Sequence, residues 1–113
     1  MEELTSEEAF DAFVAASRER PVFLFKHSSA CIVSSMAWKQ VESYLQKTGD
    51  PAPVYLVKVI ESRHISDMAA ERLELKHASP QLMLVKDGKV VWHTSHYGVL
   101  RPRIARAARE AQA

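Results

Sequence analysis

The hydrophobic residues of this chain fall into two patterns: dense runs of strand-forming residues, and stripes that repeat every three or four positions. The runs at residues 22–25, 53–60 and 79–94 are rich in aromatic and β-branched side chains, which is typical of buried strands. Asp87-Gly88 divides the third run and is a strong signal for a two-residue hairpin, because a type I′ turn needs two residues at positive φ. The helical stripes predict helices over residues 6–18, 31–47, 62–75 and 100–112.

Two of the predicted helices carry further signals about their ends and faces. Thr5 begins the sequence Thr-Ser-Glu-Glu, which fits a capping box at the start of the first helix. In the last helix, the spacing of Leu100, Ile104 and Ala108 predicts the buried face. The arginines of this helix are then expected to lie in solvent, and they are Arg101, Arg103, Arg106 and Arg109.

The order of these elements predicts one α/β domain that covers residues 1–113. A strand–helix–strand unit crosses over right-handed and makes its two strands parallel, and the hairpin then adds two antiparallel strands. Helices must cover both faces of such a sheet. We therefore expect a thioredoxin-like fold, with a four-stranded mixed sheet flanked by helices and an extra helix at the N-terminus.

The composition indicates where the protein works and which classes of partner are not expected. Of the 113 residues, 47% are hydrophobic and 26% are charged, which is ordinary for a soluble globular domain. No apolar run approaches 18 residues, and the acidic N-terminus lacks the apolar segment of a secretory signal. We therefore expect a cytoplasmic protein that does not enter a membrane. Fifteen basic residues against 14 acidic ones give no reason to expect a nucleic acid as partner.

The single cysteine, Cys31, follows the first buried strand and precedes a predicted helix. One cysteine excludes an internal disulfide and a zinc site built from several cysteines. A lone cysteine is most often a small buried hydrophobic residue, so its position is what points to chemistry. Reactive groups in open α/β sheets gather beyond the carboxyl ends of parallel strands, where helix N-termini favour a thiolate over a thiol. Lys26 and His27 lie just before the cysteine and could add positive charge.

Ser34 occupies the position at which a dithiol oxidoreductase of the C-x-x-C type carries its second cysteine. A serine cannot attack a mixed disulfide, but its hydroxyl can donate a hydrogen bond to a thiolate one helical turn away. The predicted chemistry is therefore monothiol. Cys31 attacks a mixed disulfide and becomes joined to one of its two thiols. An external thiol then attacks this new disulfide and frees Cys31.

Ser79 and Pro80 precede the first strand of the hairpin. Proline here could simply open an edge strand. In thioredoxin-like folds, however, a cis-proline at this point faces the active cysteine, and its loop pairs with the bound substrate like an added strand. We therefore expect a cis Ser79–Pro80 peptide bond and a substrate contact at both residues.

These segments together resemble the monothiol bacilliredoxins, small thioredoxin-like proteins of bacteria that use bacillithiol instead of glutathione. The similarity runs from about Phe10 to Ala107. It is carried by Phe-Lys-His-Ser-Ser-Ala-Cys with Ser34, by Lys-His-Ala-Ser-Pro-Gln and by Val-Val-Trp-His-Thr-Ser-His.

The resemblance implies an enzyme that removes bacillithiol, a cysteinyl-glucosaminyl-malate, from S-bacillithiolated proteins. Cys31 would be the catalytic thiol, Ser34 its serine partner and Pro80 the cis-proline. We also expect Ser79, Pro80, His27, Ala30 and Ile32 to contact the substrate. Free bacillithiol would be the co-substrate, with no tightly bound cofactor or metal, and a flavoprotein reductase would recycle the bacillithiol disulfide. Ile32 replaces the proline of the family motif Thr-Cys-Pro-Ile-Ser and restores one N–H donor near the sulfur.

Two other functions remain open at this stage. A thioredoxin-like adaptor or redox sensor would itself be S-thiolated at Cys31 without turnover. A glutathione-using monothiol glutaredoxin would hold an iron–sulfur cluster between two chains, but the bulky Ile32 and Val33 argue against it.

The histidines also leave several roles open. His77 could line the substrate groove, and His93 and His96 could bind a carboxylate such as malate. His27 and Cys31 supply only two metal ligands, which is too few for a zinc site.

Overall fold

A five-stranded sheet with the strand order β1-β3-β2-β4-β5 forms the centre of the computed structural model, which describes residues 1–112. The strands are β1 (Glu2–Glu3), β2 (Val22–His27), β3 (Val54–Lys58), β4 (Gln81–Lys86) and β5 (Lys89–Ser95). The helices are α1 (Glu7–Glu19), α2 (Ile32–Lys47), α3 (Arg63–Arg72) and α4 (Arg101–Gln112), with a short 3-10 helix, η1 (His96–Gly98), between β5 and α4.

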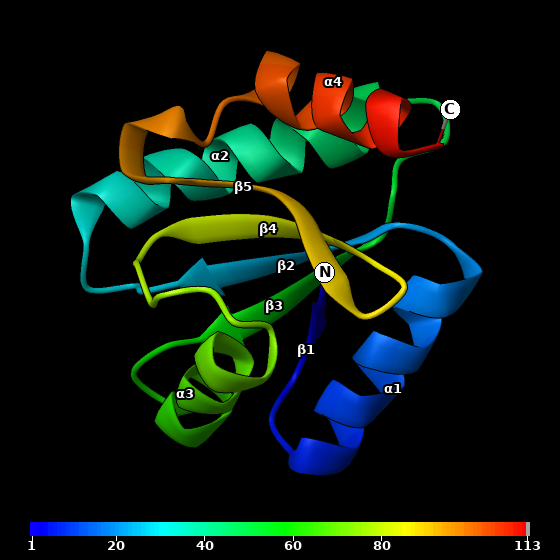
Figure 1. Cartoon of the computed structure of the whole chain (residues 1–113). Coiled ribbons are helices and arrows are strands. Elements are labelled where there is room, and N and C mark those ends of the chain that lie inside the picture. The colour runs from blue at the N-terminus through cyan, green and yellow to red at the C-terminus, as the bar shows by residue number, and fades with distance from the viewer. Residues whose placement is uncertain (113) are drawn as a thin grey trace.

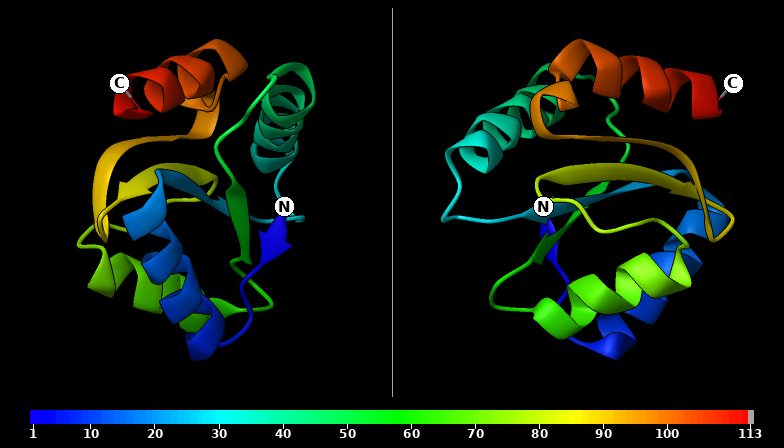
Figure 2. Two further views of the ribbon diagram at one scale, coloured as in Figure 1. Left: turned by 90° about the vertical axis from the view of Figure 1, so that its right-hand side faces the viewer. Right: turned by 60° about the vertical axis from the view of Figure 1, so that its left-hand side comes forward.

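Strands β1, β3 and β2 are parallel, whereas β4 pairs antiparallel with β2, and β5 antiparallel with β4. Helices α2 and α4 cover one face of the sheet, and α1 and α3 cover the other (Figures 1 and 2). The alternation along β2 serves both faces: Phe23 and Phe25 pack toward α2 and α4, whereas Val22 and Leu24 pack toward α1 and α3. The predicted thioredoxin-like α/β class is confirmed, with α1 as the extra N-terminal helix.

The sheet has one strand more than the four predicted. Glu2 and Glu3 pair with Tyr55 and Leu56 of β3, and the N–H of the buried Leu4 then donates to the Leu56 carbonyl oxygen at 2.8 Å. Two exposed glutamates carry no hydrophobic alternation, so β1 has no pattern by which sequence analysis could find it.

Several predicted ends and turns can be checked against the structure. The N-cap of α1 is Ser6 rather than Thr5, and the Ser6 Oγ accepts a hydrogen bond from the Ala9 N–H at 3.1 Å. The predicted hairpin turn is confirmed, because Asp87 and Gly88 both have positive φ values, 53° and 77°. Helix α3 ends at Arg72 rather than at residue 75, and Glu74 follows in a left-handed conformation at φ 53°.

Helix α4 confirms two of the three residues predicted for its buried face. Ile104 and Ala108 are buried, but Leu100 is 42% exposed because α4 begins only after it, at Arg101. The predicted solvent face is confirmed, and its exposed residues are Arg101, Arg103, Arg106 and Arg109.

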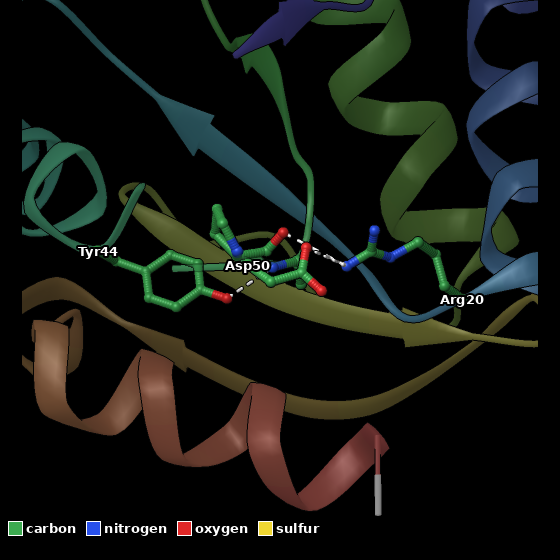
Figure 3. A network of polar contacts seen from close by, with 5 residues as sticks. Arg20, Tyr44 and Asp50 are labelled. Carbon is green, nitrogen blue, oxygen red and sulfur yellow. Dashed lines mark hydrogen bonds and ion pairs between the residues drawn. The ribbon is translucent and has the colours of Figure 1, made fainter. Parts of the chain in front are cut away.

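The connection from α2 to β3 fixes the end of the sheet that lies opposite the carboxyl ends of β2 and β3. Tyr44, buried near the end of α2, accepts a hydrogen bond from the Ala52 N–H at 2.8 Å (Figure 3). The Arg20 Nη2 lies 4.0 Å from the Asp50 Oδ1 and 3.4 Å from the Pro51 carbonyl oxygen. The exposed Arg20–Asp50 pair contributes little stability, so the buried tyrosine is the stronger tie.

Candidate functional site

Cys31 lies beyond the carboxyl end of β2, at the point where the sequence predicts it. It is the N-cap residue of α2, has an extended backbone at φ −119° and ψ 126°, and makes no side-chain capping hydrogen bond. Its side chain is partly exposed and forms no disulfide. The first backbone N–H groups of a helix have no partner within the helix, so the thiol lies beside free donors and the positive end of the α2 dipole.

Ser34 is completely buried in the first turn of α2 and ties the helix to the loop before it. Its Oγ accepts a hydrogen bond from the Ser28 N–H at 2.9 Å and lies 2.7 Å from the His27 Nδ1. These two contacts join the start of the loop that carries Cys31, at His27 and Ser28, to the first turn of α2 after it. Within residues 1–112 the Ser34 hydroxyl has no hydrogen bond to the cysteine sulfur, so the bond to a thiolate stays a prediction.

His27 is a half-buried residue whose ring packs among aromatic side chains. The ring centroid lies 4.7 Å from that of Trp38 and 5.6 Å from that of Phe25. Burial lowers the pKa of His27, although the Ser34 hydrogen bond and the Glu61 carboxylate oppose that shift. The neutral imidazole is therefore favoured at neutral pH, so the positive charge expected from His27 beside the cysteine is not favoured.

Lys26 points to the opposite face of the sheet, because successive residues of a strand alternate. Its side chain is completely buried, and its Nζ lies 3.2 Å from the His77 Nδ1, which is also 3.4 Å from the Ser66 Oγ. Burial lowers the pKa of Lys26 to about 8, with the Asp67 carboxylate opposing the shift. Burial and then the charge of Lys26 lower the pKa of His77, so the neutral ring accepts the ammonium hydrogen. Lys26 therefore contacts His77, at the start of the Pro80 loop, on the face of the sheet opposite His27.

The loop before β4 lies next to the end of β2, as predicted, because Gln81 pairs with Lys26. The Ser79–Pro80 peptide bond is cis, the isomer expected from the sequence, and Pro80 is buried. The Pro80 carbonyl oxygen accepts a hydrogen bond from the His96 N–H at 3.0 Å. Within residues 1–112, the buried Ser79 Oγ and Gln81 Oε1 have no hydrogen-bond partner.

The remaining predicted residues lie in exposed positions. Ala30 and Ile32 flank Cys31, and Ile32 is 80% exposed. His93 lines a hollow near the hairpin turn, whereas His96 begins η1 and its Nδ1 lies 3.0 Å from the Ser95 Oγ. The structure therefore gives these two histidines different surroundings.

The part of the chain from residue 1 to residue 112 holds no group of three or more histidine, cysteine, aspartate or glutamate side chains that could bind a metal ion. None of the helices described there is both long and apolar enough to cross a bilayer.

A cavity of about 460 Å³, which no pattern in the sequence predicted, lies beside the cysteine loop. Its walls come from the loop, from one face of α2 and from the end of β3 with the turn after it. The lining residues are His27, Ser29, Ser35, Trp38, Lys39, Glu42, Lys58 and Glu61. The helical spacing of Ser35, Trp38 and Glu42 was visible in the sequence, but nothing there showed which residues of β3 would face them.

The hydrogen bonds of Ser34 predict that Ser34→Ala destabilises the fold by about 1–3 kcal/mol, because the buried Ser28 N–H and the His27 ring each lose a partner. The matched control is Ser35→Ala, one residue on. The exposed Ser35 Oγ has only a 3.5 Å contact with the Cys31 carbonyl oxygen, and we expect a change within about 0.5 kcal/mol. Urea unfolding followed by far-UV circular dichroism measures both values, and equal stabilities for the two variants would contradict the assigned role of Ser34.

Comparison with known proteins now adds to this geometry. The model of the family described as monothiol bacilliredoxin BrxC matches residues 2–104. A solved structure of a protein proposed to be an oxidoreductase with a thioredoxin fold superposes with a TM-score of 0.84 and 28% identity, covering 94% of this chain and 91% of that one.

Two thioredoxins show the same fold at lower identity. Fasciola hepatica thioredoxin has a TM-score of 0.75 and 17% identity over 98% of this chain and 99% of its own. Malassezia sympodialis thioredoxin has a TM-score of 0.77 and 18% identity over 100% and 91%. The match to the family model extends over most of the chain and includes Cys31, Ser34 and Pro80. The chain therefore belongs to the monothiol bacilliredoxin BrxC family, and its single thiol has a redox role on a thioredoxin-like fold.

Proposed function

We propose that this protein is a thiol-disulfide oxidoreductase that removes bacillithiol from S-bacillithiolated proteins by a monothiol route. The observation that carries the proposal is the chain's one thiol, partly exposed at the N-terminus of α2 where a second cysteine is replaced by the buried Ser34. A thiol in this position is accessible to a disulfide and lies beside helix donors that stabilise its anion. Membership in the bacilliredoxin family supports bacillithiol as the small thiol.

The reaction proceeds in two exchanges. The Cys31 thiolate attacks the bacillithiol sulfur of the protein–bacillithiol disulfide, and the protein's cysteine leaves as a thiolate. The thiolate of a second bacillithiol then attacks the bacillithiol sulfur now bound to Cys31, and Cys31 leaves as a thiolate. In sum, the target protein is reduced, one free bacillithiol is consumed and leaves joined to the formerly protein-bound bacillithiol as bacillithiol disulfide, and the enzyme is unchanged. A flavoprotein reductase would restore the free bacillithiol.

Three parts of the site support these steps. The Ser34 hydrogen bonds fix the loop that presents Cys31. Ala30 and the exposed Ile32 flank the sulfur and offer contact surface to a protein substrate. Ser79 and Pro80 lie in the loop before β4, next to the end of β2, because the following residue, Gln81, pairs with Lys26. We propose that they contact the substrate backbone there.

The direct test mixes the protein with a single-cysteine protein that carries bacillithiol, in the presence of free bacillithiol. Intact mass spectrometry follows the loss of the adduct, and the same target carrying glutathione, with free glutathione, is the matched control. We expect catalytic release of bacillithiol at a rate well above that for glutathione. No acceleration over bacillithiol alone would contradict the proposal. An adduct that forms on Cys31 but is not released by bacillithiol would instead assign the redox-sensor function.

A further inference from the structure

We infer that the 460 Å³ cavity beside the cysteine loop binds the non-sulfur part of the small thiol, an inference that rests on the proposed function. Concave sites of roughly 300–1,000 Å³ are the usual size for small ligands. This cavity lies on the α2 and β3 side of Cys31, away from the Pro80 loop beside β4. The two sides of the sulfur would then serve the two halves of a mixed disulfide.

The cavity borders the segment that carries the sulfur, although Cys31 is not itself one of the lining residues. Ser29 and Ser35, two of its lining residues, lie two positions before and four positions after Cys31. Ser35 is one turn along α2, and a helical turn rises only about 5.4 Å. A small thiol joined to Cys31 by a disulfide can therefore lay the rest of its length in the cavity.

The charges of the cavity indicate what kind of molecule it accepts. Lys39 and Lys58 supply ammonium groups, and Glu42 and Glu61 supply carboxylates. Within residues 1–112, one of these four charged side chains forms an ion pair: the Lys58 Nζ lies 3.5 Å from the Oε1 of Glu3, which is outside the cavity lining. Exposed pairs of this kind are weak, so both lysines remain available to a ligand. The lining thus fits a molecule that carries carboxylates and an ammonium group together.

The rest of the wall suits a hydroxylated ring. The half-buried Trp38 contributes an indole that is held against the His27 ring, and Ser29 and Ser35 contribute hydroxyls. The His27 ring is favoured in its neutral form, so it can form a hydrogen bond with a ligand hydroxyl. A neutral ring also does not repel the nearby lysine ammonium groups.

Bacillithiol carries groups of each of these kinds. Its cysteinyl ammonium lies near the sulfur, a glucosamine ring follows, and the malate end bears two carboxylates. We place the malate carboxylates on Lys39 and Lys58 and the sugar on Trp38.

The test compares Lys39→Ala/Lys58→Ala with Lys47→Ala/Lys89→Ala, a control that removes two exposed lysines outside the cavity lining. Both double variants lose the same net charge, so long-range attraction of an anionic ligand changes similarly in the two. Intact mass spectrometry follows the modification of Cys31 by bacillithiol disulfide and, separately, by the uncharged hydroxyethyl disulfide. The readout is the second-order rate constant for bacillithiol disulfide divided by that for hydroxyethyl disulfide. We expect the ratio to fall about tenfold or more in the cavity variant and to stay near the wild-type value in the control.

The outcomes separate this inference from the function on which it rests. If the wild-type protein removes bacillithiol from its target but the cavity variant keeps the ratio of the control, the cavity assignment is wrong and the proposed function stands. If the wild-type protein shows no preference for bacillithiol disulfide over hydroxyethyl disulfide and no removal activity, both are overturned. A ratio that falls equally in both double variants also overturns the cavity assignment, because net charge then explains the preference.

Discussion

Replacing Cys31 with serine is expected to abolish disulfide exchange completely while leaving the fold at least as stable as the wild type. The chain has no other thiol, and a serine hydroxyl is not a nucleophile at neutral pH. Cys31 is the N-cap of α2 without a side-chain capping bond, whereas serine is among the preferred N-cap residues. Its hydroxyl can accept a hydrogen bond from an N–H of the first turn, so we expect activity and stability to change in opposite directions.

The matched control is Cys31→Ala, which also lacks a nucleophile but cannot cap the helix. We expect both variants to be inactive and the serine variant to be more stable than the alanine variant by about 0.5–2 kcal/mol. Urea unfolding measures the stability, and the bacillithiol-release assay measures the activity. Activity retained in either variant would show that the chemistry does not pass through this sulfur.

Replacing Lys26 with methionine is expected to stabilise the protein at pH 7, by an amount that disappears as the pH rises. Burial lowers the pKa of Lys26 from 10.5 to about 8, so the folded chain releases this proton near pH 8 and the unfolded chain near pH 10.5. Between these values the unfolded state binds more protons, and the stability of the wild type rises with pH. Below pH 8 the whole cost of the buried ammonium is present, on the order of 3 kcal/mol.

Methionine keeps the length of the side chain and removes the charge, and the Ser66 hydroxyl remains beside the His77 Nδ1. The measurement is the free energy of unfolding of the two proteins at a series of pH values from 7 to 10. We expect the difference to be largest at pH 7 and to shrink above pH 8. Lys89→Met, at an exposed lysine of the hairpin, should show no such trend. A difference for Lys26→Met that is constant across this range would refute the assigned titration.

Sequence patterns predicted the elements that form the sheet and its helices because those elements bury periodic hydrophobic faces. The run from Phe23 to Phe25, the Asp87-Gly88 turn and the stripe containing Val41 each have a local signature that the structure confirms. Strand β1 was missed because it is held by backbone pairing with β3, and this leaves no trace in two glutamate side chains.

The site was only partly predictable, for a related reason. The position of Cys31 could be predicted because it lies between two elements, β2 and α2, that are consecutive in the sequence. The partners of Lys26 and His27 do not follow from local order, because the alternation of β2 sends these neighbours to opposite faces and into contact with residues seven to 51 positions away. The cavity depends in the same way on the register of β2 and β3, which sets His27 beside Lys58.

The buried Ser34 hydroxyl also bears on how a monothiol protein could change its chemistry. A cysteine at this position would create a dithiol motif with a single substitution, but its sulfur is larger than oxygen and a much weaker hydrogen-bond partner. The Ser28 N–H and the His27 ring, both satisfied by the hydroxyl, would then meet a poor acceptor in a space shaped for a smaller atom. A second thiol at this position would therefore require the loop to be rebuilt around it, so the two hydrogen bonds of Ser34 oppose a change to a two-cysteine site.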